Sequence, residues 1–214
     1  IDGSGALQSA AANQPRWHYT GSVLAGLLVE GAATNDQLWC RDCTQAAGWT
    51  ALNMTRVNVA TGVDGATNSA SRLTSVASNA YVQGTQILAG GAPYTASVFM
   101  RRVSGSGSVS ISADLGATST VVALTTTWQR FTATASPAGN AALRVTLATS
   151  GDVVEVDLAQ LEAGSGASSP ILTTSAAAAR AAESATCATG AASPDAGTLA
   201  ITGMALVLPT SGTS

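Results

Sequence analysis

Charged side chains are scarce in this chain of 214 residues: only 10% of its residues are Asp, Glu, Lys or Arg, against roughly 25% in an ordinary soluble domain. The chain has no lysine, so all nine basic residues are arginine, and it has a single histidine. With a net charge of −3 and no basic stripe, we expect no nucleic-acid binding through phosphate neutralisation. The surface must consist largely of Ser, Thr, Ala, Gly and Asn, which suits exposed β-structure and tight assembly.

Long apolar runs and aromatic residues are also scarce. No stretch approaches the ~18 apolar residues that a membrane span requires, so we expect no membrane insertion, and no signal peptide is visible. Aromatic residues make up only 4% of the chain. Few large side chains are therefore available, either to fill a core or to stack on sugar rings.

Cysteine is limited to Cys40, Cys43 and Cys187, an odd number that argues against a closed disulfide framework. Cys40 and Cys43 have the C-x-x-C spacing, but no second such pair and no histidine pair completes a zinc site. A redox pair would begin a helix in a βαβ context, which the flanking residues do not indicate. We therefore expect two small, semi-buried structural side chains.

What the chain has instead is apolar alternation with a period of two between residues 49 and 163. "SVSISADL" places Val109, Ile111, Ala113 and Leu115 on one face, and "YTASVFM" and "ALRVTL" alternate in the same way. Clusters of Gly, Asn and Pro separate some eight or nine such runs. No helical period intervenes, so the pattern predicts an all-β fold, a jelly-roll-like antiparallel β-sandwich.

The two ends differ from this central part. We expect residues 1–35 to be an irregular segment with a strand that joins the sandwich, and a short extended piece at Arg16–Thr20. Residues 36–164 form the sandwich, and residues 165–214 a linker with the start of a second β domain. "SAAAARAAESA" (175–185) has high helix propensity but no apolar stripe, so an exposed helix and an extended linker both stay open. "GTLAITGMALVLP" (197–209) predicts one or two further strands.

Glu30 stands out in "GLLVEGAATN" (26–35), because it follows an apolar run directly. It could be a catalytic acid, a metal ligand or the end of a structural strand. We expect the third, with the carboxylate accepting hydrogen bonds from the backbone or from an arginine such as Arg16. Asn35 is expected to cap the loop that follows through its side chain.

Acid–base chemistry finds little support. Glycoside hydrolysis usually needs two carboxylates ~5–10 Å apart, and Glu155 and Asp157 do lie at i and i+2 on one face of a predicted strand. Such neighbours on an exposed sheet are commonly just solvated. His18 has no serine elbow or cysteine partner near it. We therefore expect the protein not to be an enzyme.

Sugar binding requires aromatic platforms with polar groups beside them. Trp49 and Trp128 stand at strand starts and Tyr94 lies on an apolar strand face, so we expect all three in the core. The least core-like aromatic residues, with their polar neighbours, are the candidate carbohydrate-binding residues: Trp39, Arg41, Tyr81 and Gln83.

A structural calcium is the one cofactor that the sequence leaves open. In a sandwich of this type, oxygen ligands from a loop and the last strand would hold it. Asp42, Asp64 and Asp157 are the candidate donors, although no EF-hand-like spacing supports them.

An ordered set of segments carries a resemblance to a known group of proteins. "AANQPRWHYTGSVLAGLLVEGAATN" (11–35), "LWCRDCTQAAGWT" (38–50) and "GVDGATNSASRLT" (62–74) resemble successive blocks of many bacteriophage tail, fibre and other virion-surface proteins. "VDLAQLEAG" (156–164) and "SPILTTSAAAARAAE" (169–183) resemble the exit from that domain. In these relatives Cys40 and Cys43 usually correspond to a serine and an aromatic residue, and the middle portion resembles carbohydrate-binding modules.

The resemblance implies a virion-surface structural or adhesin protein, in a tail fibre, tail tip or head spike, that contacts host-surface polysaccharide. Its partners would be other virion proteins and a host glycan, with homo-oligomers, trimers above all, as in fibre proteins generally. It would be assembled in the bacterial cytoplasm and displayed on the particle, as one segment of a longer architecture. The alternative is a purely structural virion component that mediates subunit assembly without binding glycan.

Overall fold

The computed structural model describes residues 14, 16–20 and 23–184, and these form β-strands and no α-helix. They belong to two compact units: Glu30–Ala182, called here the sandwich unit, and a second unit to which the first two strands and Glu183 belong. No helix in the described part of the chain is long and apolar enough to cross a membrane. Cys187 and the strands predicted at 197–209 lie outside the described residues.

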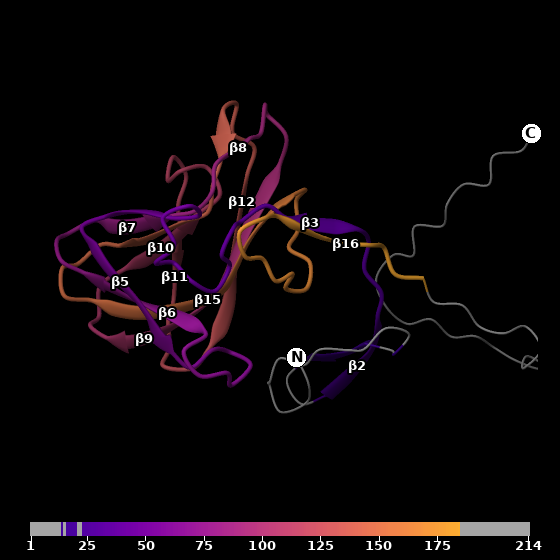
Figure 1. Cartoon of the computed structure of the whole chain (residues 1–214), viewed down its shortest axis with the longest axis horizontal. Helices are drawn as coiled ribbons and strands as arrows, with labels where there is room; N and C mark the ends of the chain where they lie inside the picture. Colours follow the sequence, from indigo (N-terminus) through magenta and orange to yellow (C-terminus); the bar gives the residue numbers. More distant parts are fainter. Residues whose placement is uncertain (1–13, 15, 21–22, 185–214) are drawn as a thin grey trace, which may run out of the picture. The chain divides into compact units, whose positions relative to one another are not determined.

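The sandwich unit is built on two five-stranded sheets (Figure 1), which confirms the predicted antiparallel β-sandwich. Sheet I has the strand order β11 (Thr120–Val122), β10 (Val109–Ser112), β14 (Arg144–Leu147), β7 (Ala80–Gln83) and β4 (Thr50–Leu52). Sheet II has the order β12 (Gln129–Ala135), β9 (Tyr94–Ser104), β15 (Val153–Ala163), β6 (Ala70–Ser75) and β5 (Met54–Ala60). All pairings within both sheets are antiparallel.

The core between the sheets is made by the alternation that the sequence displays. Val109 and Ile111 of sheet I and Val98 and Met100 of sheet II are completely buried, and they belong to one cluster. Each such side chain contributes about 2 kcal/mol by leaving water. Leu115 departs from the predicted pattern, because it lies in a turn with a φ of 60° and is only partly buried.

Sheet II is buried on its outer face as well, which the alternation did not predict. Ser97, Glu155, Asp157, Gln160 and Glu162 are all at most 2% exposed. Buried polar groups must be hydrogen-bonded or paired to be tolerated, so this face is a network of polar contacts rather than a solvated surface.

The segments on either side of the predicted module close against sheet II. The Asn35 amide donates to Ala159 O (3.1 Å) and Ile171 O (2.9 Å), and its Oδ1 accepts from the backbone of Gln37 (3.0 Å) and Leu161 (3.1 Å). Asn35 therefore caps the following loop, as predicted, and also links three chain segments. The compact unit Glu30–Ala182 therefore includes segments on both sides of the predicted sandwich, 36–164.

Two short strands pair where the chain enters and leaves the sandwich unit. β3 (Ala33–Asn35) and β16 (Ala178–Arg180) form an antiparallel ladder, with Ala33 opposite Arg180. For the part of "SAAAARAAESA" that the structure describes, the extended alternative is therefore correct and the helix is wrong. A backbone partner has outweighed the helix propensity of alanine.

The remaining strands form two hairpin-like pairs. β8 (Ile87–Leu88) pairs with β13 (Asn140–Ala141) within the sandwich unit. In the second unit, β1 (Arg16–Thr20) pairs with β2 (Val23–Leu28). The strand β1 confirms the predicted extended piece. Trp17 and Leu27 are directly opposite in this hairpin, and they are 51% and 46% exposed.

Candidate functional site

The outer face of sheet I presents two of the predicted ligand-binding residues, Tyr81 and Gln83. Because Val82 and Val145 point into the core, their neighbours in sequence point outward. Gln83 is opposite Arg144, and Tyr81 is opposite Thr146. Tyr81, Arg144 and Thr146 are partly exposed, whereas Gln83 is 6% exposed. The structure thus brings the predicted Tyr81 and Gln83 together and adds an arginine that the sequence analysis did not consider.

Arg144 is held in place by both predicted residues. Its guanidinium carbon lies 4.2 Å from the centroid of the Tyr81 ring, a cation–π contact. Its Nε and Nη2 donate to Gln83 Oε1 at 3.2 and 2.6 Å. The tyrosine ring is therefore a platform for the guanidinium, and the guanidinium in turn is presented on the face of the sheet. We call these three residues the Arg144 cluster.

The turn after β10 borders the Arg144 cluster. A Cβ built on Gly116 would come 2.6 Å from Arg144 Nη1, and Gly116 has a φ of +89°. Glycine is therefore required here both for the backbone conformation and for the close approach. Asp114 begins the same turn, but its carboxylate accepts hydrogen bonds from the Thr118 N–H (2.8 Å) and hydroxyl (2.5 Å).

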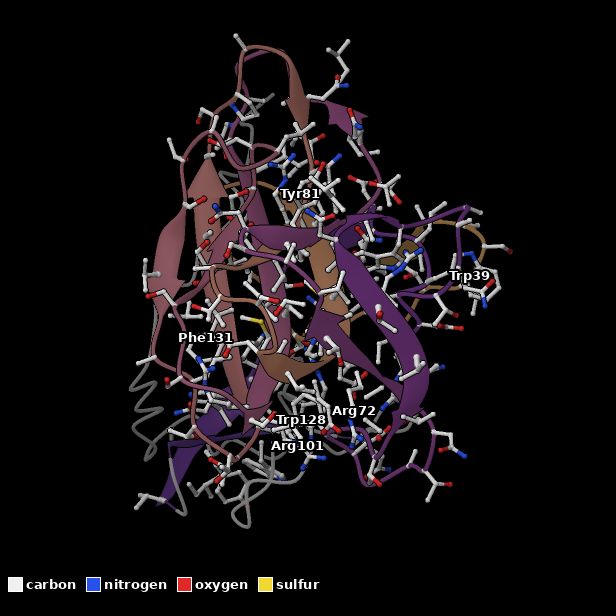
Figure 2. The ribbon with its side chains drawn as sticks, turned by 90° about the vertical axis from the view of Figure 1, so that its left-hand side faces the viewer. Trp39, Arg72, Tyr81, Arg101, Trp128 and Phe131 are labelled. Carbon is white, nitrogen blue, oxygen red and sulfur yellow. The ribbon has the colours of Figure 1, made fainter. Side chains whose placement is uncertain are left out.

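Trp39 and Arg41 are not part of this cluster, so the four predicted residues do not form one site. Trp39 lies apart from Tyr81 (Figure 2), and it is partly buried against the hydrophobic core. Arg41 donates to both carboxylate oxygens of Asp64 (2.7 and 2.7 Å) and of Asp157 (2.9 and 2.9 Å). Its charge is thus used inside the fold, and Trp39 packs against the core.

The contacts of Arg41 contradict the calcium prediction. Asp64 and Asp157 do converge, but the cation between them is the Arg41 guanidinium. Asp42 faces elsewhere and accepts from Thr44 and Gln45. Within the described residues, no group of three or more His, Cys, Asp or Glu side chains is arranged to hold a metal ion. The proposed ligand set does not fit calcium, because two of its members already neutralise an arginine.

The geometry around Asp157 explains how it reaches Arg41. The register of β15 against β9 shifts between Asp157 and Gln160, and Leu158 has a φ of 49°, a conformation that a bulky residue rarely adopts. Asp157 Oδ1 accepts the Leu158 N–H at 2.8 Å, and Oδ2 accepts the Val63 N–H at 2.9 Å. This bulge holds the carboxylate in place.

Glu155, the other half of the predicted carboxylate pair, is also occupied. It accepts from Arg72 (2.7 Å) and Arg101 (2.7 Å) and is 2% exposed. Arg101 in turn lies 4.6 Å from the Trp128 ring, and Arg72, Arg101 and Trp128 are grouped at one end of the molecule in Figure 2. The expectation that these acids are solvated is wrong, and so is the core position of Trp128, which lies outside the core cluster. The predicted core positions of Trp49 and Tyr94 are confirmed.

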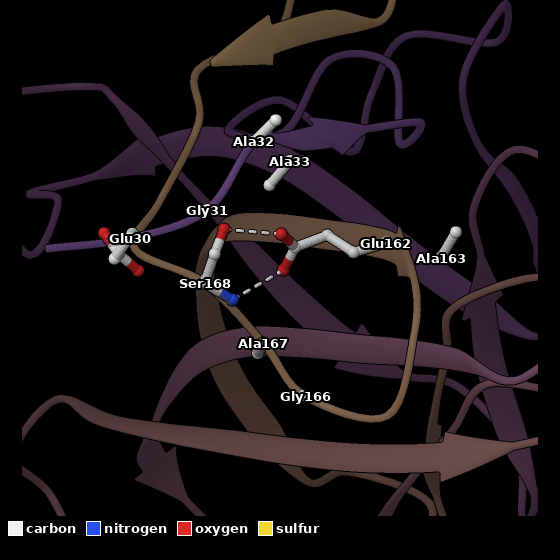
Figure 3. Close-up of a pocket in the computed structure, with 9 residues that line it drawn as sticks. All are labelled: Glu30, Gly31, Ala32, Ala33, Glu162, Ala163, Gly166, Ala167 and Ser168. Atoms are coloured by element: carbon white, nitrogen blue, oxygen red, sulfur yellow. Dashed lines mark hydrogen bonds between the residues drawn. The ribbon is translucent and has the colours of Figure 1, made fainter. Parts of the chain in front are cut away.

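Glu30 lines a shallow pocket of about 280 Å³ together with Glu162 and Ser168 (Figure 3). The Ser168 N–H and hydroxyl donate to Glu162 (3.0 and 2.5 Å), and the Ser169 N–H donates to Glu30 (2.7 Å). Both carboxylates therefore fasten the segment after β15, and the remaining lining residues are Gly and Ala.

Glu30 is thus confirmed as a structural carboxylate with backbone and arginine partners. Arg180, which the sequence analysis did not consider, supplies an arginine 3.1 Å away. Arg16 pairs with Glu183 at 2.6 Å.

Cys40 and Cys43 are free thiols, 2% and 1% exposed. Burial raises the pKa of Cys40 and raises that of Cys43 to about 12. Cys40 Sγ also accepts the Thr173 N–H at 3.2 Å. Since the thiolate is the reactive species, both cysteines are structural, as expected, and are buried more completely than expected.

No protein-family model matches the chain, and no curated protein matches it. Among solved structures, the chain is similar to the CBM22-1–GH10 modules of Clostridium thermocellum endo-1,4-β-D-xylanase 10B complexed with xylohexaose, at 15% identity and a TM-score of 0.46. That match covers 67% of this chain and 30% of the xylanase chain.

Two further similarities are comparable. The CBM22-1 xylan-binding domain of Paenibacillus barcinonensis Xyn10C gives 14% identity and a TM-score of 0.44, over 63% of this chain and 94% of that one. The enzymatically active domain of bacteriophage CBA120 tailspike protein 4 gives 11% identity and a TM-score of 0.41, over 59% of this chain and 21% of that one. At these values the function has to be argued from the chain's own residues.

Proposed function

We propose that this chain is a non-catalytic module that binds polysaccharide through the outer face of sheet I, as part of a bacteriophage virion-surface protein. The observation that carries the binding proposal is the Arg144 cluster, in which an aromatic ring, a guanidinium and an amide lie side by side on an open sheet. A guanidinium that an aromatic ring and an amide hold in place presents fixed N–H donors, which hydrogen-bond sugar oxygens. The virion location rests on the ordered resemblance to tail and fibre proteins.

The surroundings of the cluster also suit a chain-like ligand. Thr50 and Leu52 of β4 lie on one side of Gln83 and Tyr81, and Thr146 and Ser110 continue the tyrosine row on the other. Hydroxyl side chains offer both donors and acceptors to sugar hydroxyls. An extended polysaccharide that lies along these rows would meet hydroxyl groups on both sides of the Arg144 cluster.

A glycan array that includes bacterial capsular and lipopolysaccharide glycans tests this proposal. We expect the wild-type protein to bind at least one bacterial polysaccharide and Tyr81→Ala to weaken that binding about tenfold or more, because the Arg144 cluster loses its platform. Leu88→Ala is the matched control, since Leu88 is 76% exposed on β8 and should leave binding unchanged. Absence of binding to every glycan would refute the proposal.

A second candidate, assembly without glycan binding, is favoured by the β1–β2 hairpin. A two-stranded hairpin is marginally stable in water by itself, and its opposed Trp17 and Leu27 are both about half exposed. Contact with another virion subunit would cover this face. Sedimentation of wild type and Trp17→Ser would test it: a shift to a smaller species in the variant, together with an empty glycan array, would favour assembly.

A further inference from the structure

We infer, as an extension of the proposed function on which it rests, that the polysaccharide is acidic and that Arg144 binds a carboxylate on one of its sugars. The inference concerns the class of ligand, which glycan binding alone leaves open. It depends on three observations: how the guanidinium is fixed, which of its donors stay free, and how its charge is compensated.

The guanidinium is fixed before any ligand arrives. The Tyr81 ring supports one side at 4.2 Å, the Gln83 amide oxygen accepts two of its N–H groups, and Gly116 lies close to Nη1. An arginine side chain that is free in solution loses rotamer entropy when a ligand orders it. Here most of that cost is already met during folding, which favours binding.

The donors that remain free have the geometry of a carboxylate site. Guanidinium has five N–H donors in a planar fork. Gln83 accepts from Nε and Nη2 on one edge of this fork, whereas Nη1 and the second N–H of Nη2, on the other edge, donate to no described residue. Two parallel N–H groups on one edge match the two oxygens of a carboxylate. Because Arg144 lies over Tyr81, it is also the guanidinium rather than the ring that a sugar would meet first.

The charge of Arg144 is not compensated inside the fold. Five other arginines of the sandwich unit meet carboxylates: Arg41 with Asp64 and Asp157, Arg72 and Arg101 with Glu155, Arg102 with Asp152, and Arg180 with Glu30. Arg56 and Arg130 of sheet II do not, because Arg56 donates to the backbone carbonyls of Cys43 and Trp49 and Arg130 to the Ser97 hydroxyl. Arg144 forms no ion pair with any described carboxylate, and its hydrogen-bond partner is the neutral Gln83. The carboxylate nearest in the strand register, Asp114, is bound to Thr118.

The other side chains of this face do not oppose an anion. The two rows across sheet I consist of Thr50, Gln83, Arg144 and Ser112, and of Leu52, Tyr81, Thr146, Ser110 and Val121. They contain one positive charge and no negative one. A neutral polysaccharide would gain hydrogen bonds from the guanidinium, whereas an acidic one would gain charge neutralisation as well.

The test is binding to matched glycan pairs that differ only in charge, namely uronic-acid polysaccharides and their methyl esters, by isothermal titration and on an array. We expect the wild type to bind the acids about tenfold or more tightly than the esters, with affinity that falls as salt is added. Arg144→Gln should lose this preference and its salt dependence, and Arg144→Lys should keep part of both. Arg72→Gln, on sheet II, is the control, because it removes the same charge at a distant site.

The outcomes separate this inference from the proposed function. If esters and acids bind equally, or if Arg144→Gln keeps the preference for acids, the inference is wrong while glycan binding stands. If the preferred array members carry phosphate or sulfate and uronic acids do not bind, the anion is misassigned. If no glycan binds at all, both proposals fall together.

Discussion

On the outer face of sheet II, Arg41, Arg72 and Arg101 each meet a buried carboxylate, whereas on sheet I Arg144 meets only a ring and an amide. The two faces therefore use the same residue type in different ways. On sheet II arginine neutralises acids that the fold has removed from water, and losing one partner leaves a buried charge. On sheet I the guanidinium is positioned by neutral partners alone. Arg56 and Arg130 of sheet II also lack a carboxylate partner, but Arg56 donates to backbone carbonyls and Arg130 to the Ser97 hydroxyl.

Asp157→Ala should lower the free energy of unfolding more than the other substitutions compared below. The side chain of Asp157 is completely buried and accepts hydrogen bonds from Arg41, Val63 and Leu158. Its removal leaves two backbone N–H groups without their acceptor and leaves Arg41 with the partly exposed Asp64 as its remaining carboxylate partner. We expect a loss of about 3 kcal/mol in the free energy of unfolding, measured by denaturant titration. A loss below about 1 kcal/mol would show that solvent replaces Asp157 easily.

Asp64→Ala should be milder, because this partner of Arg41 is 30% exposed. We expect about 1 kcal/mol or less, and the difference from Asp157→Ala measures the effect of burial on one arginine. Equal effects in the two variants would contradict this ranking.

The Asp64 carboxylate should make the stability of the fold depend on pH in acid. Hydrogen bonds from Arg41 lower the pKa of Asp64 to about 2. A lowered pKa stabilises the fold above the ordinary value of 3.8, and that contribution is lost as pH falls from about 4 towards 2. The gap in Tm between wild type and Asp64→Asn should therefore be constant at pH 5–7 and close in acid. A gap that widens below pH 4 would contradict the assignment.

The smallest effect is expected on sheet I. Arg144→Ala should change the free energy of unfolding by no more than about 0.5–1 kcal/mol, since no buried carboxylate loses its partner. Denaturation of this variant beside Asp157→Ala compares the two faces directly. A loss as large as that of Asp157→Ala would make Arg144 a structural residue and would remove the basis for acidic-glycan binding.

A chelator should leave the stability of the sandwich unit unchanged. Because Arg41 stands between Asp64 and Asp157, we expect an excess of EDTA to leave the Tm of the sandwich unit unchanged. A drop of several degrees, restored by added Ca²⁺, would mean that a metal stabilises the protein through other ligands.

The fold could be predicted from the sequence where the signal is local. Alternation in "YTASVFM" and "ALRVTL" correctly assigns Val98, Met100, Val145 and Leu147 to the core. The structure has twelve strands from β4 to β15, more than the predicted eight or nine, because strands of two or three residues such as β8 and β13 are too short to show a period.

The site could be predicted only in part, since its key contact is non-local. Tyr81 and Gln83 are two residues apart and were selected together. Arg144 reaches them through the register of β7 against β14, which no local pattern encodes. For the same reason, the acids of β15 looked solvated: their arginine partners come from β6, β9 and a distant loop.

The pairing of β3 with β16 has a consequence for how such a protein can be built. With Ala33 opposite Arg180, the chain enters and leaves the sandwich unit at neighbouring points. Chain ends that lie close together allow a domain to be inserted into, or removed from, another chain with little disturbance of its host. A graft that spans residues 30–182 could therefore be placed in a surface loop of an unrelated carrier.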